Sequence, residues 1–71
     1  MLTLKNKVKQ LREQVGWTQA QLGQKVNVSR QAINAIEKEK FDPSIWLAYD
    51  LAKLFNMSIE ELFEFEESVR K

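Results

Sequence analysis

The chain of 71 residues contains neither cysteine nor histidine. Without cysteine it can form no disulfide, and it offers no thiol nucleophile and no thiolate ligand for a metal. Without histidine it lacks the commonest general base and the commonest metal ligand. No apolar stretch is long enough to span a membrane, and the first seven residues, MLTLKNK, lack the apolar run of a signal peptide. We therefore expect a cytoplasmic protein without metal, cofactor or membrane contact.

The remaining candidates for catalysis are acidic residues, which gather near the C-terminus. Glu60 and Glu61 fall in the first turn of a predicted helix, where negative charge is favourable. Glu64 and Glu66 alternate with phenylalanines, so they belong to the wet face of a predicted strand. With two glycines in all, the chain has no glycine-rich loop for a phosphate. The sequence does not predict an enzyme.

The centre of the chain, residues 18–38, predicts two short helices joined by a tight turn. Thr18 and Gln21 have the spacing of a capping box, and Ser29 is a second N-cap residue. Asn27 lies where the chain must turn sharply, and asparagine tolerates a left-handed backbone better than most residues. Apolar residues at helical spacing give each helix one buried side. This is the helix-turn-helix pattern.

The second of these helices has an apolar side, with Ile33 and Ile36, and a polar side opposite to it. The polar side carries Arg30, Gln31 and Asn34, whose donors and acceptors suit the base edges of the major groove. The alternative interpretation is an ordinary solvated face, since surface helices are normally polar on one side. The short connection to the preceding helix favours DNA binding.

This stretch resembles the helix-turn-helix of the Cro/C1-type phage repressors, also called the Xre family. The matching residues are Thr18-Gln19, Leu22, Val28-Ser29-Arg30-Gln31, Ile33 and Ile36-Glu37. The resemblance extends upstream to Leu11-Arg12 and downstream through Asp42-Pro43-Ser44 to the segment Ile59-Glu60-Glu61-Leu62-Phe63, and so covers nearly the whole chain. It is greatest to small stand-alone bacterial members such as the cytolysin repressor.

Two positions depart from the family pattern. Gly23 replaces the usual alanine where the two helices touch, and Asn27 replaces the usual glycine of the turn. Gly23 permits a closer approach but weakens its helix by roughly 0.5–1 kcal/mol. The resemblance also implies an ion pair between Arg12 and Glu37, buried beneath the DNA-facing surface.

The predicted DNA contacts divide into base contacts and phosphate contacts. In the resembling repressors the two residues after the second cap read bases, and here those are Arg30 and Gln31. Gln19 begins the first helix, where its amide and free backbone N–H groups can hold a phosphate. The predicted DNA-binding residues are Gln19, Ser29, Arg30, Gln31, Asn34, Lys38 and Lys40.

Charge is distributed unevenly along the chain, although its net value is only +1. Residues 1–40 contain eight basic and three acidic residues, whereas residues 41–71 contain three basic and seven acidic ones. The part with the helix-turn-helix is therefore basic, as a phosphate-facing surface requires. Double-stranded DNA is the predicted partner.

A first helix is predicted to begin near Asn6 and to end at the C-cap glycine Gly16. Its inner face carries Val8, Leu11 and Val15. Beyond the helix-turn-helix, Pro43 prevents the third helix from running on.

A fourth helix is expected after Ser44, and Ser58 caps a short fifth helix that reaches about Phe63. The segment Phe63 to Glu66 alternates as a strand does. Met1 to Lys5 alternates too, and its residues Leu2 to Lys5 are the only other candidate to pair with that segment. The predicted fold is all-α: five helices with a small two-stranded antiparallel sheet of the terminal segments, in one domain over residues 1–71.

The C-terminal region carries more large apolar groups than one thin subunit can cover. We predict that residues 56–67 form a dimerisation segment with an isologous two-fold interface. The predicted interface residues are Asp42, Pro43, Ile59, Leu62, Phe63 and Phe65. Such a homodimer would bind an inverted-repeat operator, and we predict a sequence-specific regulator that acts as a repressor.

A protein-interaction module is the alternative prediction. Antitoxins of toxin–antitoxin pairs use the same fold and bind a toxin as well as DNA. An exposed Trp46 beside Tyr49 would favour a protein partner. Alternatively, the Trp46 indole folds against Pro43 and its loop.

Overall fold

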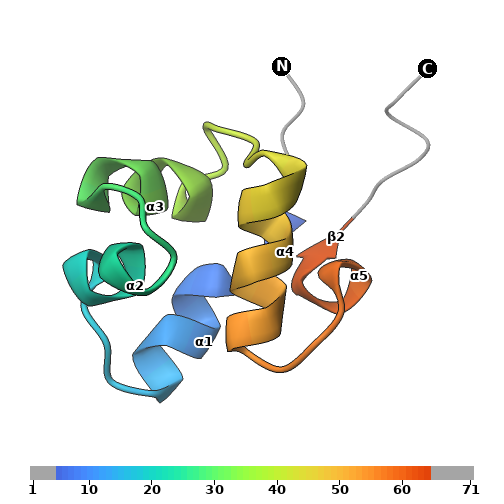
Figure 1. Cartoon of the computed structure of the whole chain (residues 1–71), viewed down its shortest axis with the longest axis horizontal. Helices are drawn as coiled ribbons and strands as arrows, with labels where there is room; N and C mark the ends of the chain where they lie inside the picture. Colours follow the sequence, from blue (N-terminus) through green and yellow to red (C-terminus); the bar gives the residue numbers. More distant parts are fainter. Residues whose placement is uncertain (1–4, 65–71) are drawn as a thin grey trace.

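The computed structural model describes residues 5–64, and this part of the chain folds into five helices and two short strands (Figure 1). The helices are α1 (Val8–Gln14), α2 (Gln19–Lys25), α3 (Arg30–Glu37), α4 (Ile45–Leu54) and α5 (Ile59–Leu62). The strands β1 (Lys5–Asn6) and β2 (Phe63–Glu64) pair antiparallel, with Lys5 opposite Glu64. The predicted all-helical fold with a small sheet is thus confirmed. The outer parts of both predicted strands, Met1–Leu4 and Phe65–Glu66, lie outside the described residues.

Hydroxyl side chains begin four of the five helices. Each accepts a hydrogen bond from the backbone N–H three residues later, at 3.0–3.1 Å between nitrogen and oxygen. Two of these caps are complete capping boxes, in which the third residue returns a side-chain bond to the N-cap backbone. The four residues are Thr18, Ser29, Ser44 and Ser58, as predicted.

The start of α1 differs from its prediction. Asn6 lies in β1 rather than at the N-cap, which Lys7 occupies without a side-chain cap bond. Asn6 still serves this helix, because its Oδ1 accepts a hydrogen bond from the Val8 N–H at 3.1 Å. Its amide nitrogen donates to the carbonyl oxygen of Ile36 at 3.0 Å. Asn6 therefore joins the sheet, α1 and α3.

Helices α1 to α4 all end in the same kind of turn. In each, one residue takes a left-handed backbone, and its own N–H and that of the next residue donate to carbonyl oxygens of the last turn, as in the Schellman motif. After α3, for example, Lys40 N–H donates to Ala35 O at 2.9 Å. The left-handed residues are Gly16 (φ 78°), Asn27 (φ 63°), Glu39 (φ 60°) and Asn56 (φ 58°). Helix α3 therefore stops at Glu37 through a turn at Glu39, well before Pro43.

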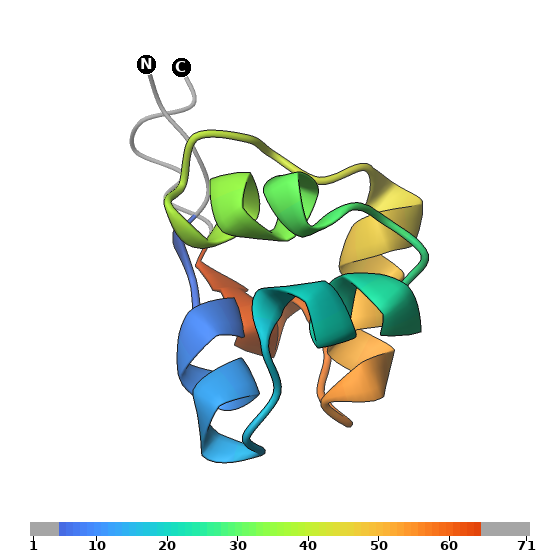
Figure 2. The same cartoon turned by 90° about the vertical axis from the view of Figure 1, so that its left-hand side faces the viewer.

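Helix α4 lies in the middle of the fold, with α2 and α3 on one side of it and α5 with β2 on the other (Figures 1 and 2). The core is formed by the buried side chains between these elements. Its largest fully buried side chains are Phe63, Leu22, Ile33, Ile36, Leu51, Leu62 and Val8. Val15, predicted on the inner face of α1, is 51% exposed because α1 ends at Gln14 and Val15 is its C-cap. Within residues 5–64, no helix has the length and apolar character needed to cross a membrane.

Two predicted interface residues belong to this core. Leu62 and Phe63 are each 1% exposed in the single chain, so they offer no apolar surface to a second copy. The short α5 ends at Leu62, and the turn into β2 directs the Phe63 side chain inward. Their side chains therefore serve the core of one chain, and their place at a dimer interface stays a prediction. Ile59 stays half-buried at the surface, and Phe65 lies outside the described residues.

A buried ion pair joins α1 to α3. Arg12 Nε donates to Glu37 Oε2 at 2.7 Å and Arg12 Nη2 to Glu37 Oε1 at 3.2 Å, a bidentate geometry. The third branch, Nη1, donates to the carbonyl oxygen of Trp17 at 2.8 Å. The hydrogen bond to Glu37 raises the pKa of Arg12 above its ordinary value and outweighs burial, which lowers it. Arg12 therefore stays charged at any physiological pH.

Gly23 of α2 lies against the turn that leads into α3. The N–H of Val28 donates to Gly23 O at 2.8 Å, so the turn folds directly over the end of α2. A Cβ atom added to Gly23 would lie 2.6 Å from Val28 O and 3.3 Å from Ser29 O, both of them backbone atoms. Glycine in place of the alanine that is usual in the family is thus explained by the turn, whose backbone lies too close to position 23 for a side chain.

We predict that Arg12→Ala or Glu37→Ala lowers the free energy of unfolding by about 3–5 kcal/mol, because each strands the other charge in the core. Glu13→Ala is the matched control, since Glu13 is an exposed neighbour 3.9 Å from Arg12 Nη2 and should change stability by less than about 1 kcal/mol. Urea unfolding followed by circular dichroism measures all three. Unfolding midpoints of both pair variants close to that of Glu13→Ala would contradict a structural role for the pair.

We also predict that Gly23→Ala destabilises the fold by about 1–3 kcal/mol, the usual cost of overpacking. The loss should appear although alanine favours a helix by about 1 kcal/mol over glycine. Gln24→Ala, on an exposed position of the same helix, should leave the melting temperature nearly unchanged. A Gly23→Ala variant that melts above wild type would show that the turn relaxes freely and that the contact is not limiting.

Candidate nucleic-acid interface

The start of α3 presents polar side chains to solvent. The Ser29 hydroxyl accepts a hydrogen bond from Ala32 N–H at 3.1 Å, which fixes the first turn. Arg30 and Gln31 are exposed on this turn, while Ile33, on the opposite side of the helix, is fully buried. The burial of one side therefore sets which side chains the helix can offer to a partner.

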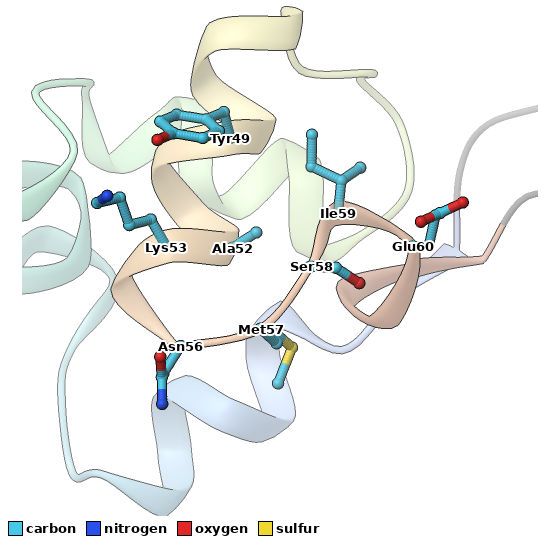
Figure 3. A pocket seen from close by; sticks show the side chains of 8 residues that line it. All are labelled: Tyr49, Ala52, Lys53, Asn56, Met57, Ser58, Ile59 and Glu60. Carbon is cyan, nitrogen blue, oxygen red and sulfur yellow. The ribbon is translucent and has the colours of Figure 1, made fainter.

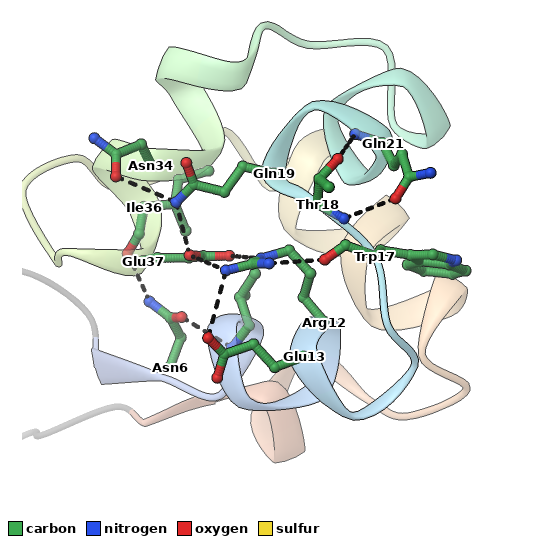
Figure 4. Close-up of polar contacts among 11 residues, drawn as sticks. Asn6, Arg12, Glu13, Trp17, Thr18, Gln19, Gln21, Asn34, Ile36 and Glu37 are labelled. Carbon is green, nitrogen blue, oxygen red and sulfur yellow. Dashed lines mark hydrogen bonds and ion pairs between the residues drawn. The ribbon is translucent and has the colours of Figure 1, made fainter.

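Behind this exposed turn, a chain of hydrogen bonds links α2 to α3 (Figure 4). Gln19, the first residue of α2, donates through Nε2 to Glu37 Oε1 at 3.0 Å and to Asn34 Oδ1 at 3.2 Å. Glu37 is the partner of Arg12, and its side chain is only 2% exposed. The half-buried Asn34 on the polar side of α3 is thus tied through Gln19 to the buried ion pair.

The lysines predicted to meet phosphates lie beyond the C-terminal end of α3. Lys38 is the C-cap residue and Lys40 follows the left-handed Glu39, and both lysines are exposed. Lys25, at the end of α2, makes a cation–π contact instead, since its Nζ lies 4.6 Å from the centroid of the Trp17 ring. Lys38 and Lys40 are therefore the freer cations of this face.

The structure places the predicted DNA-binding residues in two groups. Gln19 and Asn34 are half-buried and hydrogen-bonded to each other. The exposed group consists of Ser29, Arg30, Gln31, Lys38 and Lys40. Sequence reasoning missed the hydrogen bond between Gln19 and Asn34, because 15 residues separate the two and neither spacing nor composition relates them.

A second surface lies between α4 and α5, away from α2 and α3 (Figure 1). A hollow of about 470 Å³ opens there, with Tyr49 on α4 and Ile59 at the start of α5 among its lining residues (Figure 3). Met57 and Ala52 add further apolar lining, and Lys53 and Glu60 add charge. This hollow brings the predicted interface residue Ile59 next to α4.

Apolar side chains also protrude from the first turns of α4. Trp46 is 74% exposed and Ile45 68%, and the Trp46 ring meets the edge of Tyr49 with 6.4 Å between centroids. The indole therefore does not bury itself against Pro43, which was one of the two predicted alternatives. Phe41, in the preceding loop, is also about half exposed.

Comparison with known proteins gives consistent matches. The family model described as "Helix-turn-helix" matches residues 8–62. An uncharacterized HTH-type transcriptional regulator of Bacillus subtilis, YgzD, is 47% identical over 64 residues, which are 90% of this chain and 97% of the relative. Another from Methanocaldococcus jannaschii is 48% identical with the same coverage.

Among solved structures, the P22 c2 repressor in complex with a synthetic operator matches with a TM-score of 0.73 and 28% identity. The match covers 76% of this chain and 82% of the repressor chain. The fold and the sequence thus lead to the same group of proteins. The chain belongs to the Xre-type helix-turn-helix family of DNA-binding transcriptional regulators, with the fold of the Cro/C1-type repressors.

Proposed function

We propose that this protein is a repressor that recognises a specific operator by placing α3 in the major groove of DNA. The observation that carries this proposal is the first turn of α3, where Arg30 and Gln31 are exposed above a fully buried apolar side. The N-terminal part of a recognition helix is the part that reaches base edges. The P22 c2 repressor, of the same fold, is known in complex with a synthetic operator.

The proposed contacts divide by chemistry. Gln31 can pair with adenine through both atoms of its amide, and Arg30 can read guanine or hold a phosphate. Lys38 and Lys40, exposed beyond the end of α3, supply charge for phosphates without regard to sequence. Binding to chromosomal DNA would place the protein in the cytoplasm.

The active form proposed here is a homodimer of 71-residue domains, with the C-terminal part of the domain, residues 56–67, at the two-fold interface. Ile59 supports this, because it is only half-buried beside the hollow between α4 and α5. Asp42 and Pro43 remain proposed neighbours. A two-fold dimer presents two recognition helices about 34 Å apart, so the operator would be an inverted repeat with half-sites one turn apart.

A second candidate function is that of an antitoxin or another protein-binding module. The exposed Ile45 and Trp46 favour it, since exposed large apolar groups next to each other often mark contact surfaces. These side chains lie on α4, outside the proposed DNA contacts on α3. Both functions can therefore belong to one chain.

The DNA contacts can be tested by comparing two variants. Gln31→Ala should lose about 1–3 kcal/mol on the best operator and relax the preference at one position in each half-site. Lys40→Ala should weaken binding to operator and scrambled DNA alike, and should lower the slope of log K against log salt by about one. Fluorescence anisotropy with both DNAs across a salt series measures these effects. An equal loss by Gln31→Ala on the two DNAs would mean that α3 does not read the sequence.

The assembly can be tested with Ile59→Glu, which should yield monomers with weak operator affinity, because it puts a charge into the proposed interface. Trp46→Ala is the matched control, since it removes a more exposed apolar group from α4 and should leave the dimer intact. Sedimentation equilibrium gives the dissociation constant of each. A wild-type chain that is monomeric at micromolar concentration, or a dimer lost in Trp46→Ala and kept in Ile59→Glu, would place the interface elsewhere.

A further inference from the structure

The orientation of one side-chain amide follows from the buried ion pair. Glu37 is held as a carboxylate by the bidentate bonds from Arg12, and a carboxylate can only accept hydrogen bonds. Gln19 faces Glu37 at 3.0 Å and must therefore turn its NH₂ group, the only donor of its amide, toward that carboxylate. The negative charge of Glu37 thus determines which end of the Gln19 amide faces it.

The same NH₂ group fixes Asn34. One hydrogen of Gln19 Nε2 serves Glu37, and the second points to Asn34 at 3.2 Å, so Asn34 must offer its carbonyl oxygen there. Figure 4 shows the result: the Asn34 oxygen faces Gln19, and its amide nitrogen lies on the far side. Asn34 is half-buried one turn after the exposed Arg30, on the polar side of α3.

This orientation restricts what Asn34 can read. A bidentate contact with adenine needs an asparagine oxygen that accepts from N6 and a nitrogen that donates to N7. In this protein the oxygen is turned toward Gln19, and the NH₂ group on the far side is the end directed away from Gln19, toward a partner. A donor alone matches bases with major-groove acceptors, such as O6 and N7 of guanine or O4 of thymine.

We propose that Gln19 is a positioning residue for operator recognition, which turns the Asn34 amide so that Asn34 reads guanine or thymine instead of adenine. This rests on the proposed function, in which α3 enters the major groove. Gln19 would then act in two ways, as a phosphate contact through its backbone N–H and as the support that gives Asn34 its specificity.

Asn34→Asp is the sharpest test, because it keeps the shape of the side chain and replaces the free donor by an acceptor. Gln19 Nε2 can still bond one oxygen of the new carboxylate, which leaves the other to face the base. The preferred base at one position of each half-site should change from guanine or thymine to cytosine, whose N4 is a donor. Selection of bound sites from a random DNA pool compares the two proteins, and the added charge lowers affinity at all sites without affecting this comparison.

Gln19→Met is the second variant, since methionine has a similar length and no amide. It frees the Asn34 oxygen, so adenine should rise at that same position by about tenfold relative to wild type. Gln31→Ala is the matched control and should alter a different position. Melting curves show whether each variant is folded, and if Gln19→Met is not, the Asn34→Asp result decides alone.

Three results would overturn the proposal. The first is a wild-type preference for adenine at the Asn34 position. The second is a folded Gln19→Met that loses affinity for all sequences equally, which would leave Gln19 a phosphate contact only. The third is an unchanged preference in Asn34→Asp. Selection of no sequence by the wild-type chain would instead refute the proposed function, and this inference with it.

Discussion

The ion pair between Arg12 and Glu37 is the interaction on which the arrangement of α1, α2 and α3 depends. Arg12 also holds the carbonyl oxygen of Trp17, and Glu37 also holds Gln19, so the pair connects α1, the loop before α2, α2 itself and α3. Burying two charges costs desolvation energy that their attraction roughly offsets. The pair therefore adds little net stability when intact, and its role is to define one arrangement of the helices. Within residues 5–64, no buried side-chain polar atom lacks a hydrogen-bond partner.

The small size of the domain explains why its turns are so regular. A chain of this length buries only about 60% of its unfolded surface, so the core alone leaves little stability in reserve. Hydroxyl caps and left-handed turns satisfy the helix ends and restrict how the helices can cross. The turn at Glu39 carries a cost in stability, because a non-glycine residue with φ of 60° costs about 1 kcal/mol or more. The two backbone bonds that it allows also fix the chain that carries Lys40.

Local chemistry made much of this fold predictable from the sequence. The caps at Thr18, Ser29 and Ser58 and the turn at Asn27 depend on residues within four positions of each other, and the structure has them all. Features that depend on tertiary packing were not predictable. The bond from Gln19 to Asn34 joins two helices, and the burial of Leu62 and Phe63 depends on how α5 folds back onto the core.

In the proposed function, α3 is held by the buried ion pair and reads DNA as one of two copies. Selection of bound sites from a random pool by the unmodified chain tests this most directly. We expect an enriched inverted repeat whose half-site centres lie about 10 base pairs apart, with fixed bases in each half. Enrichment of a single unrepeated site would contradict the dimer, and a pool with no enriched sequence would contradict sequence-specific reading by α3.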